Sequence, residues 1–297
     1  MARPALPSPP ASWSGWRGMS WGAFLAFAAR PARDALILVG LGRAAWYYVV
    51  QGVHPWEWPG IDARAYWGVD LAHPYTGSEL GIVSTYLYSP AFAQFLAPAS
   101  LLPFPVFAAL WTTLLAAVAL WLIRPRPWAA LILFLPVTYE LLVGNVHFLI
   151  AAAVVVGLRS PAAWALPILT KVTPGLGLLW FAVRREWRSL GLALGVTGAI
   201  VAVSLVLAPA AWMEWIALLT RSQDAATLLP VRIVAAVIIM AFGAATDRRW
   251  LVPVAVWLAL PVVYVSSWVI LLAAVRLKTS DAAPSPEGGS TSSAPRR

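Results

Sequence analysis

Residues 104–126 read FPVFAALWTTLLAAVALWLIRPR, and the stretch 104–123 contains no charged residue. About 20 helical residues are needed to cross the hydrocarbon core of a bilayer, which is roughly 30 Å thick. Arg124 and Arg126 follow the apolar run directly. Basic residues at one end of a span are typical of its cytoplasmic side. The stretch therefore predicts a transmembrane helix over 104–123 that ends in the cytoplasm.

The composition of the whole chain agrees with this prediction. Of its 297 residues, 61% are apolar and only 11% are charged. Soluble domains contain about 25% charged residues, and a globular surface needs residues that water tolerates. The composition therefore excludes a soluble domain and predicts an integral membrane protein.

The net charge of +9 does not indicate a nucleic-acid-binding protein, because the basic residues lie at the ends of apolar runs and form no stripe with aromatic residues. The absence of cysteine excludes disulfides, thiolate metal sites and a cysteine nucleophile. We therefore expect membrane lipids, and no nucleic acid, among the partners.

Hydrophobicity and charge divide the chain into a cytoplasmic N-terminal tail (1–33), a membrane domain (34–277) and a disordered C-terminal tail (278–297). The predicted spans are 34–51, 104–123, 128–143, 145–158, 189–208 and 230–245. Three further apolar stretches are interrupted by proline or are too short to cross, and we expect them to be interfacial, re-entrant or broken: 89–102, 161–183 and 250–277. The predicted fold class is an all-α polytopic membrane bundle with about eight to ten hydrophobic segments.

The loop 52–88 is the longest polar segment between predicted spans, and it is acidic. Asp62 follows the first predicted span, so its carboxylate should lie at the outer membrane surface among Trp58, Tyr66 and Trp67. Partial burial there would raise the pKa of Asp62, which suits a general base. An alternative is that Asp62 caps a short surface helix. A second predicted outer loop spans 209–229.

Lys171 is predicted at the tip of a broken hairpin within 161–183, where a charge inside a membrane is costly and often functional. A cation near the membrane surface suits a phosphate group, and Lys171 is the first candidate for this role. The alternative is a lysine that extends its amine to the interface for solvation. Glu140, near the outer end of its predicted span, is another acidic candidate.

Several motifs occur in an order that resembles glycosyltransferase family 87, a group of polyprenol-phosphate-mannose-dependent mannosyltransferases with the GT-C fold. In the loop these are Asp62, then Tyr66, then Pro74-Tyr75, then Tyr86-Leu87-Tyr88-Ser89-Pro90. Later segments are Gly144-Asn145-Val146-His147, Lys171-Val172-Thr173-Pro174 with Arg184-Arg185-Glu186-Trp187, and Pro261 to Trp268. The ordered set covers residues 34–277.

This resemblance implies a GT-C-like bundle in a bacterial plasma membrane, with its active site on the extracytoplasmic face. Asp62 would act as the general base in an inverting transfer of a hexose, with mannose as the expected sugar, from a polyprenyl-phosphate donor to a lipid or cell-envelope glycan acceptor. No metal or other cofactor is expected. The predicted substrate-binding residues are Arg64, Tyr66, Asp70, His73, Tyr86, Tyr88, Asn145, His147 and Lys171.

Two alternatives to this activity remain open. A transporter of a small molecule or lipid would use the broken segments near Lys171 and Pro261 as its binding site. The chain is also short for the resembled family, so it could be a truncated member without activity.

Overall fold

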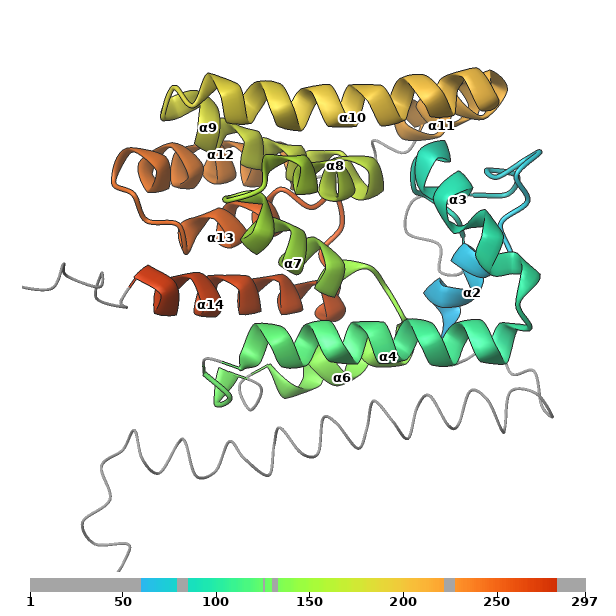
Figure 1. Ribbon diagram of the computed structural model, residues 1–297, viewed down its shortest axis with the longest axis horizontal. Coiled ribbons are helices and arrows are strands. Elements are labelled where there is room, and N and C mark those ends of the chain that lie inside the picture. Colours follow the sequence, from blue (N-terminus) through green and yellow to red (C-terminus); the bar gives the residue numbers. More distant parts are fainter. Residues whose placement is uncertain (1–59, 79–84, 125, 130–132, 222–227, 282–297) are drawn as a thin grey trace, which may run out of the picture.

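The computed structural model describes residues 60–78, 85–124, 126–129, 133–221 and 228–281 as helices joined by turns and loops (Figure 1). Within these ranges there is no β-strand, and the predicted all-α membrane bundle is confirmed. The predicted N-terminal tail and the predicted first span at 34–51 lie outside the described residues.

The bundle contains helices of different length and tilt, and the longest of them run roughly along its long axis (Figure 1). The helices of the bundle are α4 (Phe104–Ile123), α6 (Phe134–Val143), α7 (His147–Gly157), α8 (Ala165–Lys171), α9 (Leu179–Val183), α10 (Trp187–Leu207), α12 (Leu229–Ala245), α13 (Leu251–Leu258) and α14 (Leu272–Asp281). Three helices lie toward one end: α2 (Ile61–Trp67), α3 (Pro90–Leu96) and α11 (Pro209–Arg221). Short 3-10 segments complete the bundle: η2 (Ala97–Leu101), η3 (Pro161–Trp164), η4 (Thr173–Leu178) and η6 (Val265–Leu271).

Helices α4 and α10 are long and apolar enough to cross a membrane, which confirms the predicted spans at 104–123 and 189–208. Helix α4 begins after Pro103, and Arg124 follows its last residue. Only 17% of the apolar window of α10 is buried within the protein. The rest of its surface is therefore available to lipid.

Helices α6 and α7 are joined by a sharp turn at Gly144-Asn145, where the chain bends by 112°. Gly144 has a φ of 76°, a left-handed conformation that glycine adopts without strain. A Cβ atom at this position would lie 2.9 Å from the Cβ of Ala63 in α2. The predicted turn at Gly144-Asn145 is present, and its glycine also lets α2 approach closely.

The segment 161–183 forms the predicted broken hairpin. A Cβ on Gly175 would lie 3.1 Å from Ile168, and a Cβ on Gly177 would lie 2.0 Å from the Trp164 ring. These pairings require the chain after Lys171 to run back along the chain before it. Helix α8 ends at Lys171, and its C-cap residue Val172 has a φ of 49°, which is unusual for a β-branched residue.

Two segments differ from prediction. Residues 209–229, predicted as a loop, contain helix α11, because its buried Trp212, Trp215 and Leu218 form an apolar face that packs on the protein. The Trp215 indole N–H also donates to the Leu87 carbonyl at 3.1 Å. Helix α14 continues to Asp281, past the predicted boundary at 278.

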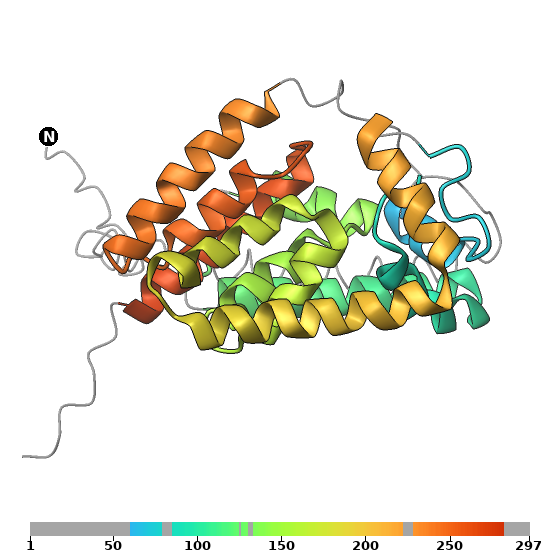
Figure 2. The ribbon, with the colours of Figure 1, turned by 90° about the horizontal axis from the view of Figure 1, so that it is seen from above.

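The two ends of the bundle differ in charge. The α9–α10 and α12–α13 connections and the C-terminal end of α14 lie at the left of Figure 1, whereas α2, α3 and α11 lie at the right; the view from above agrees (Figure 2). At the left-hand end, the Arg184 guanidinium contacts Glu186 at 2.7 Å and Asp247 at 2.8 Å. The arginine-rich connections therefore gather at the end opposite α2.

Trp164 is fully buried against Gly177, so this contact allows a test of the hairpin. We expect Gly177→Ala to lower the unfolding free energy by about 1–3 kcal/mol, because the new methyl group overlaps the indole. The measurement is the thermal unfolding temperature of the purified protein in detergent.

The matched control is Gly195→Ala in α10, where a Cβ has no atom within 4 Å. Alanine favours the helix there by up to about 1 kcal/mol. Equal unfolding temperatures for the two variants would contradict the described hairpin packing.

Candidate active site

Helix α2 carries Asp62 and is anchored to the α6–α7 turn. The Gly60 N–H donates to the Leu142 carbonyl at 2.8 Å. Gly60 has a φ of 92° and is the N-cap, so Asp62 lies in the first turn of the helix. The alternative prediction that Asp62 is the capping residue is therefore wrong, and its carboxylate is available for other contacts.

The Asp62 carboxylate is half-buried and is held by Asn145, which follows the glycine of the turn. The Asn145 side-chain amide donates to Asp62 Oδ2 at 2.7 Å. The Asn145 side-chain oxygen Oδ1 accepts a hydrogen bond from the Tyr88 hydroxyl at 3.3 Å, and the Tyr88 and Tyr66 hydroxyls lie 2.8 Å apart. The structure thus joins four of the predicted site residues in one hydrogen-bonded chain.

The surroundings of Asp62 determine its proton affinity. Burial raises the pKa of Asp62 above its ordinary value, and the negative charge of Glu140 acts in the same direction. The Asn145 hydrogen bond and the positive charge of Lys171 oppose this rise. A carboxylate with a raised pKa and a fixed orientation is suited to accept a proton from a hydroxyl group.

Glu140 and His147 form a fully buried pair beneath the same turn. The Glu140 carboxylate accepts the His147 backbone N–H at 2.7 Å and lies 3.0 Å from His147 Nδ1. The sequence indicated each residue separately but not the pair. The glycine turn between them is the signal that could have brought them together.

Lys171, at the hairpin tip, lines a cavity of about 410 Å³ between the hairpin, α11 and the break after α13. Tyr88, Trp215, Leu218 and Tyr264 also line it. The Lys171 amine lies 5.4 Å from the centre of the Tyr88 ring. Among the described residues, no carboxylate lies within ion-pair distance of this amine. The cavity is thus mainly apolar and has one cationic side chain.

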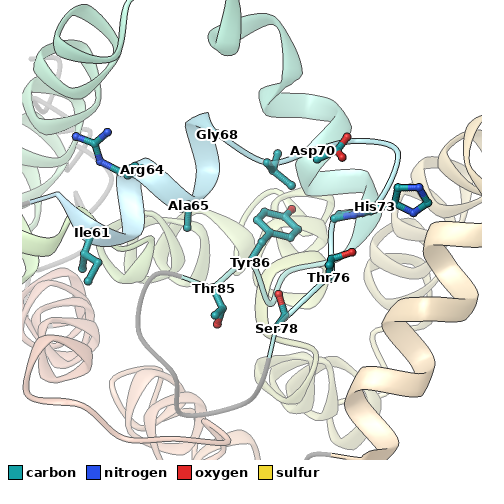
Figure 3. A pocket seen from close by; sticks show the side chains of 12 residues that line it. Ile61, Arg64, Ala65, Gly68, Asp70, His73, Thr76, Ser78, Thr85 and Tyr86 are labelled. Atoms are coloured by element: carbon teal, nitrogen blue, oxygen red, sulfur yellow. The ribbon is translucent and has the colours of Figure 1, made fainter. Parts of the chain in front are cut away.

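A second hollow, of about 570 Å³, lies on the other side of α2 (Figure 3). Asp70, His73, Thr76, Ser78, Thr85 and Tyr86 are among the side chains that line it. The Arg64 guanidinium stacks on the Phe104 ring at 3.9 Å and points away from the labelled side chains opposite it. The structure does not bring Arg64, Asp70 or His73 to Asp62.

The loop tyrosines Tyr66 and Tyr86 are buried and hydrogen-bonded within the protein. Tyr66 is 1% exposed and packs edge-on against Tyr88 and Trp111. The Tyr86 hydroxyl donates to the Ser89 carbonyl at 3.0 Å. In this structure the Tyr66 ring belongs to the core, and its hydroxyl orients Tyr88.

The sequence model of glycosyltransferase family 87 matches residues 86–286, which is more than half of the chain. The chain belongs to glycosyltransferase family 87. No curated protein and no solved structure matches it.

The part matched to glycosyltransferase family 87 includes Tyr88, Asn145, His147 and Lys171, whereas Asp62 precedes it. Family membership favours glycosyl transfer over the transporter alternative. Within the part of the chain that the structure describes, no group of three or more Asp, Glu or His side chains is arranged to hold a metal ion.

The raised pKa of Asp62 predicts a cost to the stability of this glycosyltransferase. A carboxyl group whose pKa is higher in the folded than in the unfolded state loses its stabilising contribution as the pH rises through the folded-state value. We therefore expect Asp62→Asn to unfold at a higher temperature than the wild type at neutral pH. A rise of about 2–4 °C corresponds to roughly 1 kcal/mol in a chain of this size.

The unfolding temperatures should converge as the pH falls below the ordinary pKa of aspartate. Glu186→Gln, a change from acid to amide at a half-exposed ion pair at the opposite end of the bundle, is the control and should give no such rise. A lower unfolding temperature for Asp62→Asn at neutral pH would refute this view of Asp62.

Proposed function

We propose that this family 87 glycosyltransferase transfers a hexose, with mannose as the expected sugar, from a polyprenyl-phosphate donor to a hydroxyl group of a lipid or cell-envelope glycan. The proposal extends to a bacterial plasma membrane, with the site on the extracytoplasmic face. The observation that carries it is the Asp62 carboxylate, which Asn145 holds at 2.7 Å and which Asn145 and Tyr88 link to a cavity with a cationic side chain.

The proposed reaction is a single displacement. Asp62 accepts the proton of the acceptor hydroxyl while the hydroxyl oxygen forms a bond to the anomeric carbon. The bond between this carbon and the phosphate oxygen breaks, and its electron pair leaves with the polyprenyl phosphate. One carboxylate is sufficient because the phosphate is a good leaving group, and the configuration at the anomeric carbon is inverted.

The cavity beside Lys171 supports a donor of this kind. Its apolar side chains suit the first isoprene units, and the Lys171 ammonium suits the phosphate, whose negative charge increases as the bond breaks. Tyr88 connects the cavity to the base, because its ring lines the cavity and its hydroxyl contacts Asn145.

The hollow on the other side of α2 supports a hydroxyl-rich acceptor. Asp70, His73 and Thr76 offer hydrogen-bonding groups there, and Tyr86 offers an aromatic edge. Arg64 lies at the margin of this hollow. The Phe104 ring, on which its guanidinium stacks, fixes the orientation of the Arg64 side chain. An acceptor bound in this hollow would reach Asp62 by extending its reacting hydroxyl past α2 to the bundle side of the helix, where the donor cavity lies.

The first test of the function is sugar transfer from radiolabelled polyprenyl-phosphate-mannose to lipid extract by the purified protein. We expect Asp62→Asn to lower kcat by about 10²–10⁴-fold, the usual effect of removing a general base. Glu186→Gln is the matched control and should transfer sugar at the wild-type rate. Wild-type transfer by Asp62→Asn would exclude Asp62 as the base.

Failure of the folded wild type to transfer mannose calls for the same assay with other polyprenyl-phosphate hexoses. Transfer of another hexose would correct the sugar. A protein that transfers sugar from no donor but moves the labelled compound across the membrane into the lumen of proteoliposomes would support the transporter alternative. The absence of both would support an inactive family member.

A second prediction concerns Lys171. We expect Lys171→Met to weaken inhibition of transfer by polyprenyl phosphate by about tenfold or more, because a hydrogen bond to a charged group contributes roughly 1.5–3 kcal/mol. Loss of the positive charge should also move the acid limb of the kcat/KM profile to higher pH, because Lys171 lowers the pKa of Asp62. Inhibition constants and pH profiles that equal those of the wild type would contradict both roles.

A further inference from the structure

Glu140 is a fully buried acid in the bent α6–α7 pair, which is a candidate membrane span. A charge at such a position is costly unless its contacts compensate for the loss of water. Both oxygens of its carboxylate are used, because one accepts the His147 backbone N–H and the other contacts His147 Nδ1. This carboxylate therefore closes the turn that contains Gly144 and Asn145.

The turn closed by Glu140 is also the surface on which α2 rests. The Glu140 carbonyl accepts the Gly144 N–H at 2.8 Å, and the Gly144 carbonyl accepts the Trp111 indole at 2.7 Å. The next residue, Asn145, accepts the Val146 N–H at 2.7 Å through its own side chain, which fixes the rotamer. The amide nitrogen of the Asn145 side chain is then directed at Asp62 and donates to Oδ2 at 2.7 Å.

We propose that Glu140 is a positioning residue for Asp62, acting through His147 and the Gly144-Asn145 turn to hold the Asn145 amide against the Asp62 carboxylate. The inference rests on the proposed function, since it assumes that Asp62 is the base. It assigns to Glu140 no contact with substrate.

The contacts also determine which nitrogen of His147 carries the proton. When Glu140 is ionised its carboxylate only accepts hydrogen bonds, so the contact at 3.0 Å places a proton on Nδ1. In the neutral ring, Nε2 is then an acceptor, and it is buried without a hydrogen-bond partner among the described residues. Asp62, Glu140 and Lys171 are the charged groups that act on this ring. His147 is thus held as a rigid part of the turn.

The test separates the reach of the Glu140 side chain from its charge. Glu140→Gln keeps the reach, accepts the His147 backbone N–H through its amide oxygen, places its amide nitrogen against Nδ1 and removes the charge, whereas Glu140→Ala removes both contacts. We expect Glu140→Ala to lower kcat on the order of 10²-fold, as displacement of a reacting group does, with the donor KM within about threefold of wild type. Glu140→Gln should retain kcat within about tenfold.

The pH profile provides a readout that a purely structural role does not move. Burial and the negative charge of Glu140 raise the pKa of Asp62. The Asn145 hydrogen bond and the electrostatic effects of Lys171 and His147 lower it. In Glu140→Gln the acid limb of kcat/KM should therefore move to lower pH. Thr197→Val is the control, since this buried hydroxyl bonds to Ala193 within α10 and should leave kcat and the limb unchanged.

Two results would overturn the inference. One is a Glu140→Ala protein that unfolds at a lower temperature but keeps the wild-type kcat, and the other is an acid limb that does not move in Glu140→Gln. Failure of the proposed function gives a different result, namely wild-type transfer by Asp62→Asn. The coupling between Glu140 and Asp62 can also be measured without an activity assay. For this, the pH dependence of the unfolding temperature is compared between Glu140→Gln and the double variant that also carries Asp62→Asn.

Discussion

The side-chain amide of Asn145 holds the candidate site together. It joins the turn of a bent helix pair to a short helix at the end of the bundle, across 83 residues of sequence. The turn needs Gly144, because a larger residue would meet Ala63, and it needs the Glu140 carboxylate to accept the N–H groups of His147. The position of Asp62 therefore depends on groups inside the bundle rather than on its own loop.

Much of the fold could be predicted from the sequence, because long charge-free runs with arginines at one end have few physical interpretations. The stretch 104–123 and the broken hairpin around Lys171 are examples, and both are present. Helix α11 was missed because Glu214 and Arg221 make the segment resemble a polar loop. Its apolar face becomes visible only when Trp212 and Trp215 are counted at helical spacing.

The site was harder to predict, because side chains that are close in sequence can face opposite sides of a helix. Asp62, Arg64 and Asp70 share one loop and were expected to act together. The helix turns Ile61, Arg64, Ala65 and Gly68 toward the outer hollow, whereas Asp62 and Tyr66 contact the bundle. A period of 3.6 residues separates the two sets, but the sequence does not say which set faces inward. The Glu140–His147 pair likewise depends on a turn whose geometry only the structure gives.

The contact between Trp164 and Gly177 has a consequence for the depth of the site in the bilayer. The contact joins the two arms of the hairpin, each too short to span a membrane, into one unit, whose height depends on its packing within the protein and not on the thickness of the hydrocarbon layer. The bundle, whose helix α10 is largely open to lipid, can tilt as a unit when acyl chains shorten or lengthen. The ammonium of Lys171 then keeps its height relative to Asp62 in thin and thick membranes alike.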